Sequence, residues 1–229
     1  MRRLALFIGL AVVLSNTAGA QKDSTSRPVS DHHRARAWIV PIGVVASTTL
    51  DPELREWALH THSRSLDHLA RVVNPLGTAH VLVPAMAVFY VGSLLSGSTS
   101  IQDGSLETAA AYVASDAAES ILKPLIGRQR PYVSGNSHRF HPFTNNGDWH
   151  SLPSAHIAHI ASIAEAISMQ TDSKPLSVAC DALVVLVGWD RIYEDQHWTS
   201  DVTATAALSA MISGVTVRWI RSRWTDTDR

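Results

Sequence analysis

The chain has 229 residues, of which 45% are apolar, and its 19 basic and 20 acidic side chains give a formal net charge of −1. This length suits one domain with a sizeable core, and the apolar content is too high for a disordered chain. A net charge near zero gives no electrostatic basis for nucleic-acid binding, so we expect no such partner. The single cysteine excludes an internal disulfide and any zinc site built from several cysteines.

The first 20 residues have the pattern of a secretory signal peptide. Arg2 and Arg3 precede an apolar run from Leu4 to Leu14, and Ala18-Gly19-Ala20 offers small residues for cleavage. The apolar run is too short to span a bilayer. We therefore expect residues 1–20 to be removed and the protein to be exported to the periplasm or cell envelope. An uncleaved N-terminal anchor is the alternative.

Helical signals dominate the rest of the chain, after a polar segment at 21–36 that we predict to be disordered. Asp51-Pro52 predicts the start of a helix that runs to about Val73. Gly127 predicts the end of another helix. The remaining helices are expected at about 79–96, 107–125, 154–170, 175–191 and 198–221, with a long loop at 128–152. The predicted fold class is all-α, with one domain at 37–221 built as a bundle of about six helices and a polar tail at 222–229.

The uncharged stretch from Val72 to Gln102 is long enough to cross a bilayer. However, it contains Asn74, Pro75 and Pro84, and the other helices carry acidic residues in their interiors, where a membrane tolerates them poorly. We therefore favour a soluble bundle with this helix at its centre. An integral membrane protein is the alternative.

Two histidines lie beside predicted helix starts. Ser154 is an N-cap candidate, and the free N–H groups of a helix start form a natural anion site. His156 lies in the first turn of that helix, where it can give a proton to a bound anion. His197 and Asp201 are four residues apart, so a helix beginning near His197 would place them on one face. A carboxylate that accepts the imidazole N–H would fix its tautomer and make it a nucleophile or base.

Three cations accompany these histidines at the ends of predicted helices, namely Lys123, Arg130 and Arg191. Each residue alone has an ordinary explanation as a cap or a surface charge. Together, the cations, a helix N-terminus, two histidines and an aspartate are the components of a phosphoryl-transfer site. No set of residues in the sequence suggests a divalent ion, so we expect neither a metal site nor a cofactor.

These segments resemble, in order and spacing, the signatures of the type 2 phosphatidic acid phosphatase and vanadium haloperoxidase superfamily, which includes bacterial class A acid phosphatases. Lys123 and Arg130-Pro131 match KxxxxxxRP, residues 153–156 match PSGH, and residues 190–201 match SRxxxxxHxxxD. The resemblance covers about residues 105–217. It implies the helical bundle of the acid phosphatase and vanadium haloperoxidase type.

The resemblance also implies a role for each matched residue. His197 would attack phosphorus to form a phosphohistidine, and Asp201 would orient His197. His156 would protonate the leaving alkoxide and then activate water. The phosphate oxygens would be held by Lys123, Arg130, Ser154, Ala155 and Arg191.

Two positions depart from the family signatures. Ala155 replaces glycine, which leaves the loop workable only if this residue does not need a positive φ. Asp190 replaces serine before Arg191, and it could pair with Arg191 and weaken its hold on phosphate, or it could point away. We expect these departures to reduce activity rather than abolish it.

The leading hypothesis is an exported, metal-independent phosphatase that hydrolyses phosphate monoesters. Its partner would be a small-molecule or lipid phosphate ester, with a membrane surface as a further candidate, and no oligomeric state is predicted. We expect the loop at 131–152 to shape substrate choice. One alternative is a haloperoxidase in which vanadate is the cofactor and His197 its ligand, whereas in the phosphatase vanadate would be an inhibitor. Another alternative is a phosphate-binding envelope protein with weakened catalysis.

Overall fold

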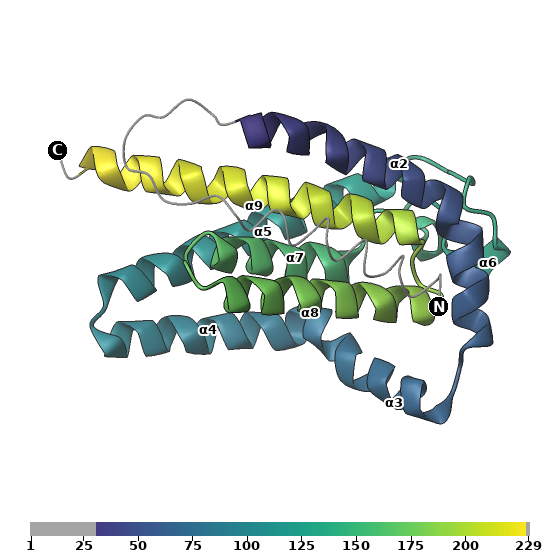
Figure 1. Cartoon of the computed structure of the whole chain (residues 1–229), viewed down its shortest axis with the longest axis horizontal. Helices are drawn as coiled ribbons and strands as arrows, with labels where there is room; N and C mark the ends of the chain where they lie inside the picture. Colours follow the sequence, from purple (N-terminus) through teal and green to yellow (C-terminus); the bar gives the residue numbers. More distant parts are fainter. Residues whose placement is uncertain (1–30, 228–229) are drawn as a thin grey trace.

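Residues 31–227 are described by a computed structural model, and eight α-helices make up most of them (Figure 1). The only pairing of strand type in this part of the chain is an isolated bridge between Arg128 and Phe140. The predicted all-α class is confirmed. The predicted count of about six is exceeded because the chain breaks after His60, inside a predicted helix, and a short helix lies in the predicted loop. The helices are α2 (Asp31–His60), α3 (Arg64–Val73), α4 (Ala79–Ser96), α5 (Thr99–Ile126), α6 (Pro131–Ser134), α7 (Ala155–Ser168), α8 (Lys174–Tyr193) and α9 (Thr199–Thr227), with 3-10 turns η1 (Asn74–Gly77) and η2 (Gly147–Trp149).

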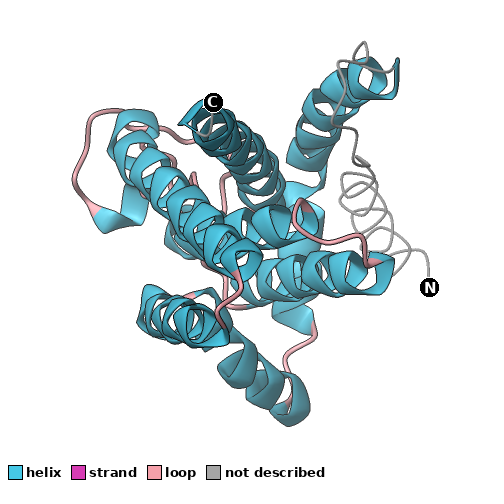
Figure 2. Cartoon of the chain, turned by 90° about the vertical axis from the view of Figure 1, so that its left-hand side faces the viewer, coloured by secondary structure: helices cyan, strands magenta, loops and turns pink. Residues whose placement is uncertain are grey.

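The core of the bundle is built around α7, which packs against α5, α8 and α9. Figure 2 shows the bundle from the side that lies at the left of Figure 1, with the helices joined by loops. Ile157 and Ile160 alternate along α7 with small alanines and meet Val187 of α8 and Val202 of α9. Small residues let the helices approach closely, so that the start of α7 is held firmly among its neighbours.

The helix α4 lies at the edge of the bundle, so its predicted position at the centre is wrong. It contacts α5 and η1, and only 6% of its residues are buried. Its side chains Val88 and Leu95 are 74% and 85% exposed. Together with Thr199–Arg223 of α9, it is one of two helices in the described chain that are long and apolar enough to cross a membrane. A largely exposed apolar helix of this length is consistent with the membrane alternative.

The N-terminal helix also differs from expectation. α2 begins at Asp31, so residues 31–36 are helical rather than part of a disordered segment. It passes through Asp51 without a break, because the Asp51 carboxylate bonds to α9 rather than capping a new helix. The predicted signal peptide and residues 21–30 lie outside the described residues. At the other end, α9 continues through most of the predicted polar tail.

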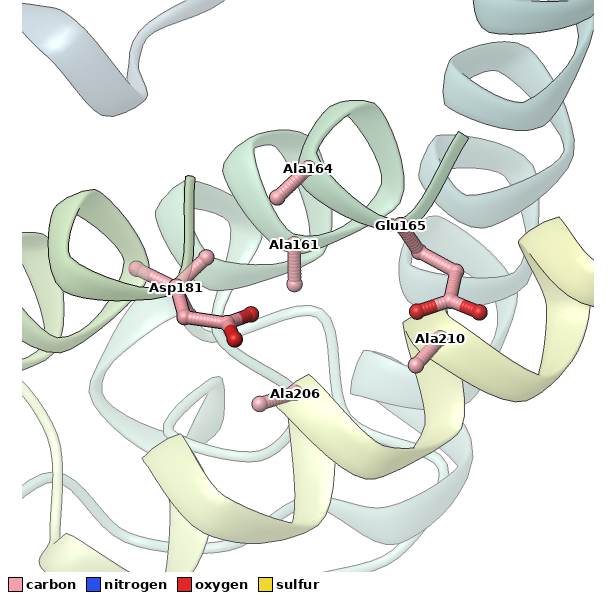
Figure 3. Close-up of a pocket in the computed structure, with 7 residues that line it drawn as sticks. Ala161, Ala164, Glu165, Asp181, Ala206 and Ala210 are labelled. Carbon is pink, nitrogen blue, oxygen red and sulfur yellow. The ribbon is translucent and has the colours of Figure 1, made fainter. Parts of the chain in front are cut away.

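A small pocket lies between α7, α8 and α9, away from the predicted site residues (Figure 3). Alanines form most of its wall, and Glu165 and Asp181 bring two carboxylates to it. This pocket is therefore a feature of the helix packing, and the predicted chemistry lies elsewhere.

Candidate active site

The predicted site residues meet at the end of the bundle where α6 lies, at the right of Figure 1. Lys123 is in the last turn of α5, Arg191 is in the last turn of α8, and Asp201 is in the first turn of α9. Ser154 is at the N-cap position of α7, without a capping bond from its side chain. Arg130 follows α5 and reaches Gln196, directly before His197, with an Nη1–Oε1 distance of 2.7 Å. Four helix ends thus bring the three sequence segments together.

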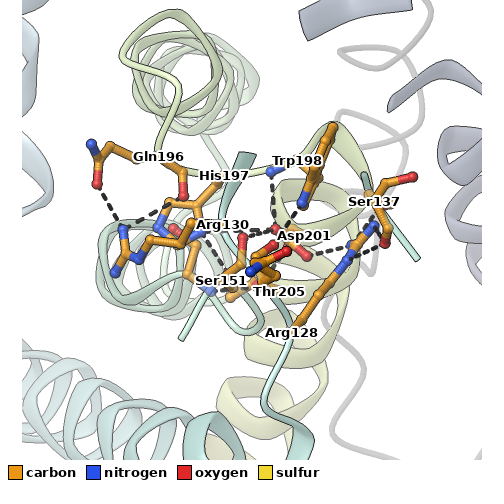
Figure 4. Close-up of polar contacts among 12 residues, drawn as sticks. Arg128, Arg130, Ser137, Ser151, Gln196, His197, Trp198, Asp201 and Thr205 are labelled. Carbon is orange, nitrogen blue, oxygen red and sulfur yellow. Dashed lines mark hydrogen bonds and ion pairs between the residues drawn. The ribbon is translucent and has the colours of Figure 1, made fainter. Parts of the chain in front are cut away.

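The imidazole of His197 is buried and held in one orientation. Its Nδ1 lies 2.6 Å from the carbonyl oxygen of Ser151 (Figure 4). A carbonyl only accepts, so Nδ1 carries the proton and Nε2 carries the lone pair. Burial, and then the positive charges of Arg130 and Lys123, lower the pKa of His197 well below 6.5. The structure therefore holds a neutral imidazole with a nucleophilic Nε2.

Asp201 does not accept the imidazole proton, which corrects the expectation from the sequence. Its nearest oxygen lies 4.0 Å from Nδ1 of His197. The carboxylate instead accepts from Ser151 Oγ at 2.5 Å and from the backbone N–H of Trp198 at 2.9 Å (Figure 4). Asp201 therefore fixes His197 indirectly, because it holds the residue whose carbonyl accepts the imidazole proton.

Arg128 is a buried residue that sequence reasoning missed. Its guanidinium donates to Asp201 at 2.5 Å and to Asp51 of α2 at 2.8 Å. It also donates to the carbonyl of Ser137, which ties the loop after α6 to the same cluster. Arg128 falls on one of the unspecified positions of KxxxxxxRP, and nothing in the sequence indicates that it is buried. It compensates two buried carboxylates, a role that an ion pair in the interior requires.

Arg191 pairs with the residue before it. Both Nε and Nη2 donate to the same oxygen of Asp190, at 2.8 and 2.5 Å. Of the two alternatives left open by the sequence, the structure shows the pair. Lys123 is likewise paired, with Glu119 one turn earlier in α5. Two of the three cations thus face a carboxylate within the site itself.

The start of α7 supplies a polar surface suited to an anion. The Ser154 hydroxyl is buried and has no hydrogen-bond partner within the described residues, while its N–H donates to Thr205. A buried hydroxyl without a partner is costly, and a bound oxyanion would satisfy it. Ala155 is not among the described non-glycine residues with positive φ, so the missing glycine imposes no strain here.

His156 faces the same cations from the first turn of α7. Burial, and then the charge of Arg191, lower its pKa to about 3, with smaller contributions from Lys123 and Arg130. The pKa of His156 is thus lowered by the same three cations that lower the pKa of His197. A bound anion would offset those charges and favour the protonated imidazole.

A comparison with family models adds to this geometry. The model of the PAP2 superfamily matches residues 105–225, more than half of the chain. The chain belongs to the PAP2 superfamily. This confirms the resemblance drawn from the three signatures. No curated protein matches the chain.

Two solved structures share the PAP2 fold of this chain. Aquifex aeolicus LpxE is 19% identical, with a TM-score of 0.61, and the match covers 74% of this chain and 95% of LpxE. The first transmembrane PAP2 type phosphatidylglycerolphosphate phosphatase from Bacillus subtilis is 16% identical, with a TM-score of 0.63. That match covers 97% of this chain and 98% of the phosphatase. The PAP2 fold therefore extends through the N-terminal helices as well.

In this PAP2 protein the loop between α6 and α7 is fastened to the end of α5. Gly127 has a φ of 59°, and a Cβ there would lie 1.9 Å from the carbonyl oxygen of His141. His141 in turn donates its N–H to the Gly127 carbonyl at 2.7 Å. Phe143 and Phe140 remain exposed beside this contact. The loop also contacts Arg130, whose Nε donates to the Gly147 carbonyl. That the loop shapes substrate choice stays a prediction.

Proposed function

We propose that the chain is a phosphatase of the cell envelope that hydrolyses phosphate monoesters of lipids through a phosphohistidine on His197. The observation that carries this proposal is a buried His197 whose Nδ1 is bonded to the Ser151 carbonyl and whose neighbour Gln196 accepts from Arg130. Burial and the charges of Arg130, Lys123 and Arg191 lower the pKa of His197. Such a pocket suits a nucleophile beside a tetrahedral oxyanion. The exposed apolar surface of α4 supports a lipid rather than a soluble substrate.

In the first step, Nε2 of His197 attacks phosphorus and the bond to the leaving oxygen breaks. His156 gives that oxygen its proton, so an alcohol leaves rather than an alkoxide. The phosphorylated imidazole keeps its Nδ1 proton, which remains bonded to Ser151. The negative charge on the phosphoryl oxygens is stabilised by the three cations and the start of α7.

In the second step, His156 takes a proton from water as the water oxygen attacks phosphorus. The phosphorus–nitrogen bond breaks, and the electron pair returns to Nε2 of His197. Inorganic phosphate leaves, and both histidines are ready for another turnover. In both steps side-chain cations stabilise the negative charge on the phosphoryl oxygens, and neither step is assigned to a metal ion.

The test is phosphate release by the protein purified in detergent, with phosphatidic acid and 4-nitrophenyl phosphate as substrates. We expect both to be hydrolysed, with His197→Ala losing at least about a thousandfold because the nucleophile is gone. His60→Ala is the matched control, since His60 is an exposed histidine bonded only to its own helix. Vanadate should inhibit without catalysing halide oxidation. Undiminished hydrolysis by His197→Ala, or halide oxidation with vanadate, would contradict the proposal.

A further inference from the structure

The turn η1 lies against His156, outside the region that the family model matches. Asn74 opens this turn, and its Oδ1 is 3.3 Å from Nε2 of His156. Gly77 closes the turn, and a Cβ at Gly77 would lie 2.8 Å from both Cβ and Cδ2 of His156. The imidazole is therefore in contact with η1 at both ends of the turn.

The turn is itself held in place by a second histidine of α7. His159 lies 2.9 Å from the Gly77 carbonyl through Nδ1 and 2.8 Å from the Asp116 carboxylate of α5 through Nε2. Both partners accept hydrogen bonds, so His159 bridges η1 to α5 as well as to its own helix. This arrangement fixes η1 relative to the first turn of α7.

We propose that Asn74 is a positioning residue for His156, and that Gly77 provides the space that this position requires. The inference rests on the proposed phosphatase function. The amide oxygen of Asn74 accepts the Nε2 proton of His156, which leaves Nδ1 as the nitrogen that exchanges a proton with the substrate. A base oriented by a third group in this way is a recurring device in nucleophilic catalysis.

The backbone at Asn74 permits a clean test. Its φ and ψ are −47° and −50°, an ordinary helical conformation that alanine adopts, and only its backbone N–H contributes to the end of α3. Asn74→Ala therefore removes the contact to His156 while leaving the turn intact. Gly77→Ala acts on the same imidazole by steric contact, and Gly92→Ala is its control because a Cβ at Gly92 meets no atom within 4 Å.

The measurement is kcat/KM for two substrates that differ in leaving group, a lipid phosphate and 4-nitrophenyl phosphate. An alkoxide needs protonation as it leaves, whereas 4-nitrophenolate does not, and kcat/KM reports the step in which the leaving group departs. We expect Asn74→Ala to lose about 10- to 100-fold on the lipid phosphate and less than about threefold on the aryl phosphate. Gly77→Ala should follow the same pattern, and Gly92→Ala should match the wild type.

Asn74→Asp gives a second readout that a purely structural contact would not move. A carboxylate beside His156 favours the charged imidazole, so the pH profile of kcat/KM for the lipid phosphate should shift to higher pH. Equal losses on both substrates in Asn74→Ala, or an unshifted profile in Asn74→Asp, would overturn the inference. Failure of the proposed function itself looks different, because the wild type would then hydrolyse neither substrate, or His156→Ala would not discriminate between them.

Discussion

Asp190 places a negative charge beside a residue expected to hold phosphate. Its carboxylate takes two hydrogen bonds from Arg191 and is itself fully buried. A guanidinium that already faces a carboxylate in the interior attracts an incoming anion less strongly. The aspartate thus provides a physical reason for the lower activity expected from the sequence, since it moderates the positive charge of the pocket.

We expect Asp190→Asn and Asp190→Ser to strengthen inhibition by vanadate about tenfold, which corresponds to about 1.4 kcal/mol. The measurement is the vanadate inhibition constant for hydrolysis of 4-nitrophenyl phosphate. Asp181→Asn is the control, because Asp181 is an acidic residue of the same helix that lines the alanine pocket instead. Weaker inhibition in both Asp190 variants would contradict this prediction. It would show that Asp190 holds Arg191 in position to bind the anion rather than weakening its attraction for it.

At the scale of the elements, α4 carries the clearest departure from a soluble protein. Most of its apolar side chains are exposed, and its main contacts are with α5 and η1, while Leu82 packs against the core. An 18-residue helix with a mean hydropathy of 1.7 is close to the length needed to cross the hydrocarbon core. Because α4 begins directly after η1, lipid contact along α4 would place the His156 end of the bundle near the membrane surface.

The position of α4 relative to the membrane can be measured by spin labelling, because only one native cysteine has to be replaced. In a Cys180→Ser background, a nitroxide attached at Val88→Cys should be more accessible to oxygen than to a water-soluble nickel complex once the protein is in vesicles. The same label at Asn145→Cys, in the exposed loop before η2, should show the opposite order. Oxygen partitions into lipid, whereas a polar complex remains in water. Preference for the nickel complex at position 88 would place α4 in water and contradict the prediction.

Over the whole molecule, the folded state holds two neutral histidines within a pocket of cations. The pKa of His156 is about 3 and that of His197 lies well below 6.5, whereas both titrate near 6.5 in the unfolded chain. At these two histidines the unfolded chain therefore binds more protons than the folded one as the pH falls from about 6.5. Their contribution to the free energy of unfolding falls with the pH through this range.

We predict that the thermal unfolding midpoint in detergent falls between pH 7 and about 4, and that His156→Gln makes this fall less steep. The variant removes a group that only the unfolded state protonates in this range. His60→Gln, an exposed position on α2, should keep the wild-type dependence. A steeper fall in His156→Gln than in the wild type would mean that His156 is protonated in the folded protein.

The three segments that meet at the end of the bundle could be picked out from the sequence because the spacing of their residues is local to each segment. Two helix ends could also be predicted, because the signals for them are local in the sequence. These are the start of α7 after Ser154 and the end of α5 before Gly127. The roles of Asn74 and Arg128 could not be predicted. Asn74 is 82 residues from its partner His156, and Arg128 is 73 residues from its partner Asp201. Such contacts exist only once the helices have packed.

The place of α4 was missed for a different reason. A run of apolar residues has the same hydropathy whether it lies in a protein core or against lipid, so composition alone does not separate the two. The acidic residues of other helices argued for water, but Glu119 is buried against Lys123 and Glu107 against Arg221. Charges that are paired inside the bundle say little about what surrounds it.

The contact between Gly127 and His141 has a consequence for redesign of this protein. Any side chain at Gly127 would displace the loop backbone at His141. The same loop contacts Arg130 through the Gly147 carbonyl, so this contact would be disturbed as well. A new specificity should therefore be introduced within residues 132–150, with Arg128, Arg130 and the contact between Gly127 and His141 retained. Within such a graft, the side chain of Phe143 can vary because this residue is 83% exposed, but its N–H donates to the Pro124 carbonyl and this contact should be kept.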